Sequence, residues 1–254
     1  MKRALKPSVG VSHLIIFLTG GLGLVIVLFL RSAAAAAPGE ESLQRVRQFA
    51  DTLIADGRDR YGSVSTPMWV SMLDLKTRRI PKTKDPNWQR SYDAEDYMRN
   101  ARGSNLHRDL FTVRTFYELS QLTGDQKYAA AADAYLRYFM GHCQSQATGL
   151  YAWGEHMFYN VVRDEIEATR HELERQLPAW EEMWRLDPNS VRREIEAIYR
   201  IHIWDKETFN FDRHGNYYTG QFDDLRVRGP YAKHSGLYAF SFYFLYTKTG
   251  EAKH

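Results

Sequence analysis

Apolar residues recur every three or four positions along four stretches of the chain, and this spacing predicts helices. A looser stretch with several prolines separates the first helix from the others. The predicted helices run from about Glu41 to Ile54, from Leu106 to Thr123, from Asp125 to Met140 and from Pro230 to Thr247. We expect the second and third helices to form a hairpin, because a glycine ends one and an aspartate can cap the next.

Capping signals predict two further helices in the second half of the chain. Thr169 and Glu172 have the spacing of a capping box, which would place Arg170 and His171 at the first two helical positions. Asp187, followed by a proline, has the pattern of an N-cap and first helical residue. The prediction is therefore an all-α fold with long aromatic loops between helices.

A short motif follows two of the predicted helices. Thr249-Gly250-Glu251 repeats Thr123-Gly124-Asp125 after an aromatic helix. Helical hairpins repeated with a glycine stop are typical of an (α/α) toroid, a closed ring of helix pairs. Because His254 falls within the helix that Glu251 should begin, we expect residues 38–254 to be the N-terminal part of a toroid catalytic domain, an incomplete barrel in a truncated chain.

The N-terminus carries an export signal. Basic residues precede an apolar run from Leu14 to Leu30, and small residues follow from Ser32 to Ala37. This pattern predicts a signal peptide or a membrane-anchor helix within residues 1–37, with alanine-rich cleavage sites that favour the signal peptide. The protein is expected to be periplasmic, secreted or anchored to a membrane.

Composition excludes some classes of function. The 34 basic and 31 acidic residues are interspersed and leave a net charge of +3, without the basic runs of a nucleic-acid-binding protein. Cys143 is the single cysteine, so no intrachain disulfide can form. Glu194 and Glu196, among arginines, predict a solvent-facing side of their helix, and His202 is expected in its apolar wall.

Four histidines lie in motif-like segments. His107 stands in GSNLHRD, His156 in GLYAWGEHMFYN, His171 in TRHELER and His214 in FNFDRHG. Each could be a hydrogen-bonded structural histidine, but four of them at predicted helix starts or loops together favour a binding or metal site. The aromatic residues around His156 could stack on sugar rings or belong to the core.

The segment RHEL at 170–173, the following LPAWEEMWRLDPNSVRREIEAIYRIHIWD and FDRHG resemble family 2 polysaccharide lyases, the pectate lyases built on an (α/α) barrel. The segment GLYAWGEHMFYN is similar to a glycan-facing loop of that family. The resemblance covers roughly residues 60–250, and 169–215 is its most specific part. It implies a uronate polysaccharide as substrate.

The resemblance also implies roles for individual residues. Arg170 would be catalytic, and His107 and His171 would bind a divalent metal, with Glu155 favoured as third ligand and Glu118 or His156 as alternatives. A ligand set of two histidines and one carboxylate favours manganese, because calcium prefers ligand sets made only of oxygen atoms. Calcium is the alternative. The candidate substrate-binding residues are Asn105, Trp153, His156, Tyr159 and His214.

The chemistry implied is β-elimination, in which a base removes the C5 proton of a uronate whose carboxylate is neutralised by a cation. Arginine normally stays protonated, so this role for Arg170 requires a strongly perturbed site, and a carboxylate clamp or structural ion pair is the alternative. A toroid hydrolase or epimerase would use paired carboxylates from Asp109, Glu155 and Asp164. A non-catalytic glycan-binding fragment is the third hypothesis.

Overall fold

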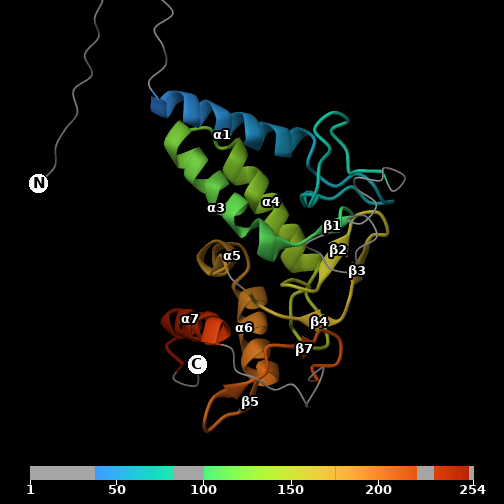
Figure 1. Ribbon diagram of the computed structural model, residues 1–254. Coiled ribbons are helices and arrows are strands. Elements are labelled where there is room, and N and C mark those ends of the chain that lie inside the picture. The colour runs from blue at the N-terminus through green and yellow to red at the C-terminus, as the bar shows by residue number, and fades with distance from the viewer. Residues whose placement is uncertain (1–37, 83–99, 175, 222–231, 252–254) are drawn as a thin grey trace, which may run out of the picture.

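A computed structural model describes residues 38–82, 100–174, 176–221 and 232–251 of the chain (Figure 1). About half of these residues are helical, and a little β-sheet accompanies them. The predicted signal or anchor segment 1–37 lies outside the described residues. Among the helices that are described, none is both long and apolar enough to span a membrane.

The described elements are six helices and seven short strands. The helices are α1 (Pro38–Ala55), α3 (Leu106–Thr123), α4 (Lys127–His142), α5 (Trp180–Leu186), α6 (Pro188–His202) and α7 (Ala232–Thr249). The strands are β1 (Gly103–Ser104), β2 (Phe158–Asn160), β3 (Glu165–Glu167), β4 (Arg170–His171), β5 (Ile203–Asp205), β6 (Asn210–Phe211) and β7 (Gly215–Asn216). They form the antiparallel sheets β1-β2-β3, β4-β7 and β5-β6.

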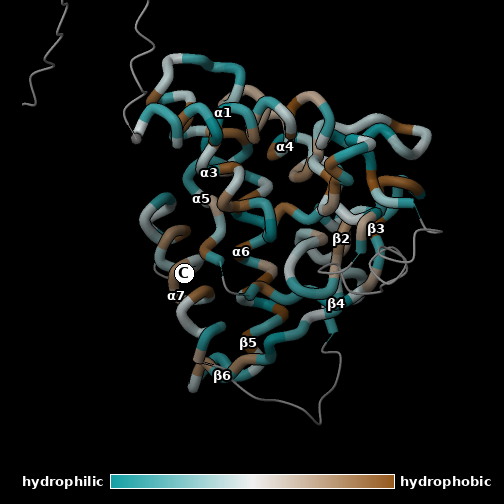
Figure 2. Tube along the Cα trace, turned by 45° about the horizontal axis from the view of Figure 1, so that its top comes forward, coloured by the Kyte–Doolittle hydropathy of each residue, from teal (hydrophilic) through white to brown (hydrophobic). Residues whose placement is uncertain are grey.

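The helices form two groups with the small sheets beside them (Figure 1). α1 lies along the hairpin of α3 and α4, and α6 contacts both α5 and α7. Large aromatic side chains fill the interior, with Trp69, Trp153 and Trp180 all at most 2% exposed. Hydrophilic residues run along much of α1 (Figure 2), which is consistent with one side of that helix facing solvent.

Local signals located α3 and α6 correctly. α3 ends at Gly124, whose φ of 75° is the left-handed conformation that glycine adopts without strain. Gly250 after α7 has the same conformation, with φ of 70°, so the repeated motif ends both helices in the same way. Asp187 caps α6 by accepting a hydrogen bond from the Ser190 N–H, as predicted.

The predicted helix start at Thr169 is wrong. Arg170 and His171 form β4, which pairs with Asn216 and Gly215 of β7, and the next helix begins only at Trp180. The capping-box spacing is a local signal, and pairing with a strand distant in the sequence outweighs it.

The fold class is helix-rich, and the small sheets correct the all-α prediction. Consecutive helices do contact one another, from α3 with α4 to α6 with α7. The closed (α/α) ring stays a prediction.

Candidate active site

The chain around β4 presents two chemically different faces. In an extended chain successive side chains point in opposite directions. His171 therefore faces the core, where it contacts Trp153, and Glu172 faces a cluster of histidines on the other side. Arg170 shares the face of Glu172 and is partly exposed. In the segment RHELE, alternate side chains therefore face the apolar core and the charged cluster.

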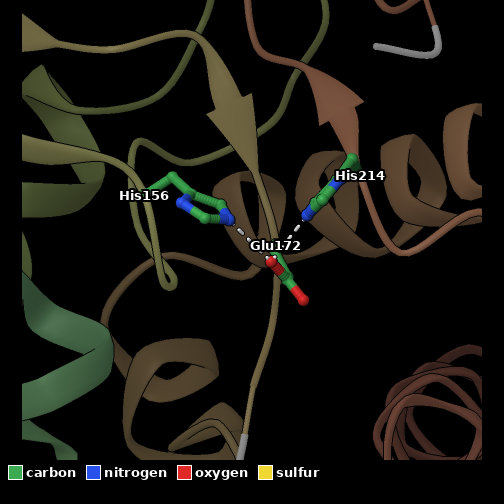
Figure 3. Close-up of side chains that lie close together, drawn as sticks. All are labelled: His156, Glu172 and His214. Carbon is green, nitrogen blue, oxygen red and sulfur yellow. Dashed lines mark hydrogen bonds and ion pairs between the residues drawn. The ribbon is translucent and has the colours of Figure 1, made fainter. Parts of the chain in front are cut away.

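Glu172 is the centre of the charged face (Figure 3). Its Oε2 lies 3.0 Å from Nε2 of His156 and 2.9 Å from Nε2 of His214, and Figure 3 shows the two rings on either side of the carboxylate. Its Oε1 contacts Nε2 of His234 at 2.9 Å and the Arg213 guanidinium at 3.1 Å. The ligand atoms of His156, Glu172 and His214 all lie within 4.8 Å of one another.

This carboxylate is fully buried and still ionised. Burial alone would raise its pKa, but the hydrogen bonds from His156, His214 and His234 outweigh burial and hold the pKa of Glu172 well below its usual range. Two of these histidines keep contact with solvent, since the side chains of His156 and His214 are 30% and 14% exposed. Glu172 is thus a buried negative charge covered by histidines, two of which remain partly exposed.

A second buried carboxylate lies two residues further along the same face. Glu174 accepts a hydrogen bond from Lys233 at 2.5 Å and lies 3.6 Å from the Arg108 guanidinium. Its side chain is 1% exposed, whereas that of Lys233 is 44% exposed. The two carboxylates therefore hold a group of cationic side chains whose outer parts reach solvent.

Gly154 brings the loop that carries His156 against this strand. Its φ is 104°, and an added Cβ would lie 1.8 Å from the Glu172 carbonyl oxygen, so no other residue fits this backbone approach. The Glu155 N–H donates to the same carbonyl at 3.2 Å. Asn105 is the N-cap of α3, and its side-chain amide donates to the backbone carbonyls of Gly154 and Met157. These two hydrogen bonds hold the loop against the start of α3.

Comparison with known proteins gives this cluster a context. A family model described as "Periplasmic pectate lyase" matches residues 82–235, which is more than half of the chain. The chain belongs to the periplasmic pectate lyase family. Arg170, the Glu172 cluster and Glu174 all lie inside the matched range.

One curated relative of this pectate lyase family member is a pectate disaccharide-lyase of Dickeya dadantii (strain 3937). The two are 28% identical over 119 residues, which is 45% of this chain and 22% of the relative. The chain therefore spans about a fifth of the length of the curated relative it matches.

On the side of β4 that faces the core of the family member, uncharged groups form a chain of hydrogen bonds. Nδ1 of His202 lies 2.9 Å from the Asp212 carbonyl, which can only accept, so this nitrogen carries the proton. Nε2 of a neutral His202 must then accept from Nδ1 of His171 at 2.8 Å. Nε2 of His171 is left as the acceptor of the Trp153 N–H at 3.0 Å. Both ring nitrogens of His171 are thus engaged in the core.

Glu194 lies at the end of this chain of hydrogen bonds, beside His171. The prediction that Glu194 faces solvent is wrong. Glu194 is 0% exposed, accepts from the backbone N–H of Tyr151 at 2.5 Å and lies 3.1 Å from Nε2 of His171. Burial raises the pKa of Glu194 to about 8 and lowers the pKa of His171 to about 3. At neutral pH both groups are uncharged, so their contact is a hydrogen bond and not an ion pair.

This burial predicts a pH-dependent stability difference for Glu194→Gln. The folded carboxyl stays protonated up to about pH 8, while the unfolded one ionises above its ordinary value of 4.5, so unfolding releases a proton between these values. We expect the free energy of unfolding of the variant to rise relative to the parent across this window, by up to about 1.4 kcal/mol per pH unit. Urea denaturation at several pH values measures it. A difference that is flat between pH 5 and 8 would contradict the buried neutral carboxyl.

His107, Glu155 and His171 do not form a three-ligand group among the described residues. Nε2 of His107 lies against the backbone N–H and carbonyl of Glu174, and burial lowers the pKa of His107 to about 4. Its Nδ1 has no hydrogen-bond partner in the described part of the chain. Glu155 is partly exposed beside Gly154. Their metal role stays a prediction.

The predicted substrate-binding residues separate into two groups. Asn105, Trp153 and Tyr159 are buried, with at most 6% exposure, and they cap a helix, fill the core and pair within a sheet. His156 and His214 meet at Glu172, where both remain partly exposed. The structure therefore joins two of the five at one site.

Sequence reasoning missed both carboxylates of the site and most of their cationic partners. Glu172 was assigned to a helix cap, and neither Glu174 nor His234 was given a role in it. The period-two alternation of charged and apolar residues from Arg170 to Glu174 was the available signal, since it is typical of a half-buried extended segment.

Proposed function

We propose that this chain carries the site of an exported lyase that cleaves pectate or a related uronate polymer by metal-assisted β-elimination. One observation carries the proposal. Within the range matched by the pectate lyase family, two fully buried carboxylates hold a partly exposed group of cations and histidines. The family description supports a periplasmic location, and the N-terminal pattern supports export by a signal peptide or an anchor.

The charge of the site suits an anionic sugar polymer. The site has three positive charges, on Arg108, Arg213 and Lys233, and two negative charges, on Glu172 and Glu174. With neutral histidines, its net charge is therefore +1. Arg170 on the same face adds another positive charge. Guanidinium groups bind carboxylates through paired hydrogen bonds, so the partly exposed Arg213 is suited to a uronate carboxylate.

The proposed reaction starts with removal of the proton at C5 of the uronate. The electron pair of that C–H bond forms the C4–C5 double bond, and the bond from C4 to the glycosidic oxygen breaks. That oxygen leaves with the bonding pair and takes up a proton. Arg170 is the proposed base, by resemblance.

A divalent cation, if bound here, would neutralise the uronate carboxylate and so make the C5 proton more acidic. The residues fit such an ion, because histidine nitrogens and a carboxylate oxygen converge at Glu172. This donor set favours manganese over calcium, which prefers oxygen ligands.

Arg170→Lys tests the proposed base. We expect its turnover of polygalacturonate to fall by about 100- to 10,000-fold, because a positioned proton acceptor contributes in that range and lysine lacks the planar guanidinium. The absorbance of the unsaturated uronide product measures it. Arg163→Lys, on an exposed arginine of the β2–β3 turn, is the matched control and should retain the activity of the parent. Equal activity of Arg170→Lys and the control would exclude Arg170 as the base.

The same assay separates the alternatives. New reducing ends without ultraviolet absorbance would favour a hydrolase, and binding of polygalacturonate without any product would favour a glycan-binding module. Two of the three carboxylates predicted for a hydrolase are engaged elsewhere: Asp109 accepts from the Tyr135 hydroxyl at 2.7 Å, and Asp164 accepts from the Ser63 hydroxyl at 2.6 Å.

A further inference from the structure

We propose that a cavity between α6 and the loop 146–149 binds a small oxyanion, such as the carboxylate of a sugar acid, through Arg193 and Arg200. The loop lines one side of the cavity, and Arg193, Glu196 and Arg200 line the other. Its volume is about 160 Å³, which is roughly ten times the space that one water molecule requires. None of the lining residues belongs to the Glu172 cluster, so the cavity is a separate site.

Gly149 allows the loop to lie against α6. Its φ is 87°, in the left-handed region that favours glycine, and an added Cβ would lie 3.1 Å from the carbonyl oxygen of Arg193. Next to it, the Thr148 hydroxyl donates to the carbonyl of Tyr217 at 2.6 Å. These contacts fix the loop on two sides, so the cavity is formed before any ligand binds.

Uncharged oxygens hold both arginines in place. Arg193 donates to Oε1 of Gln144, whose own amide group donates to two backbone carbonyls at 2.8 Å. Arg200 donates to the backbone carbonyl of Thr148 at 2.5 Å. Gln144 and Thr148 are at most 6% exposed, so packing keeps these acceptors in position. Each guanidinium is therefore oriented by a partner that does not neutralise its charge.

The cavity keeps a net positive charge. In the described part of the chain, neither Arg193 nor Arg200 forms an ion pair, and each donates one hydrogen bond out of the five that a guanidinium offers. Glu196 is the one carboxylate among the described lining residues, and Arg192 binds it at 3.0 Å. Two arginines and one glutamate give the lining a net charge of +1. Because planar guanidinium groups bind carboxylates and phosphates through paired hydrogen bonds, an oxyanion is the class of ligand that fits.

Titration of the whole chain with galacturonate and, separately, with inorganic phosphate, followed by nuclear magnetic resonance, tests the cavity. We expect saturable shifts of the backbone amide signals of Thr148 and Gly149, which report on the loop and not on the proposed active site. Arg193→Gln and Arg200→Gln should each weaken binding by at least about 10-fold, because each removes charge-assisted hydrogen bonds. Glu196→Gln should instead tighten binding by about 2- to 5-fold, because it removes a negative charge beside the anion.

Two controls accompany the titration. Arg163→Gln, on an exposed arginine of the β2–β3 turn, should bind as the parent does. The methyl ester of galacturonate keeps the sugar ring but lacks the charge, and it should cause no shift of the loop signals. The remaining amide signals of each variant show that it is folded.

Tighter binding of galacturonate than of phosphate would assign the cavity to sugar acids, and the reverse order would assign it to free phosphate; both results support an oxyanion site. Three results would overturn it: no saturable shift with either probe, equal binding of the acid and its ester, or unchanged binding by both Arg193→Gln and Arg200→Gln. The shifts do not depend on turnover, so a chain without lyase activity that shows them would keep this site and exclude only the proposed reaction.

Discussion

Glu172→Gln should abolish Mn²⁺ binding, with a loss of at least about 100-fold, and should lower the free energy of unfolding by about 3 kcal/mol. The substitution keeps the shape of the side chain but removes the one charge that His156, His214, His234 and Arg213 share. It also replaces one acceptor oxygen by an amide N–H, although the Arg213 guanidinium beside it can only donate. Calorimetry with Mn²⁺ and urea denaturation measure the two effects.

Glu174→Gln is the matched control for this variant. It removes an equally buried carboxylate from the same face, where Lys233 and Arg108 are its ionic partners. We expect a comparable loss of stability, while Mn²⁺ binding stays within a few fold of the parent because no proposed ligand is touched. If both variants lost Mn²⁺ binding equally, the effect would come from the general charge of the face, and the assignment of Glu172 as a ligand would be wrong.

Gly154→Ala should lower the free energy of unfolding by about 3 kcal/mol or more. A non-glycine residue at a φ of 104° costs about 1 to 3 kcal/mol, and overpacking against rigid atoms costs a similar amount. The new Cβ would meet the backbone carbonyl of Glu172, which cannot rotate away, so the loop must leave the strand. That movement breaks the bond from Glu155 N–H to Glu172 and displaces His156. Thermal and urea denaturation measure the loss.

Gly236→Ala provides the opposite expectation for the same chemical change. Gly236 lies in the interior of α7, and an added Cβ there meets nothing within 4 Å. Alanine should stabilise this helix by about 0.5 to 1 kcal/mol. Gly154→Ala with the stability of the parent would show that the loop can separate from the strand without cost, and the placement of His156 beside Glu172 would then lose its support.

Sequence patterns predicted the elements whose cause is local. The Asp187 cap of α6 and the glycine stop after α3 depend on side chains a few residues from the backbone groups they satisfy. The resemblance to pectate lyases also came from contiguous motifs, and the family match confirmed it. His156 and His214 were both predicted as sugar contacts, and His156 also as an alternative metal ligand, but the sequence did not show that both meet at Glu172.

The sequence by itself determined that the chain is helix-rich, where α3 and α6 begin and to which family the chain belongs. Only the tertiary structure decided that Arg170 and His171 form a strand, because their partners lie more than forty residues away on β7. It also decided that Glu194 is buried against His171, since helical periodicity does not show which polar residue meets a partner in the core. The Glu172 cluster is tertiary for the same reason. Its histidines belong to a loop, a strand end and a helix that converge only when the fold is formed.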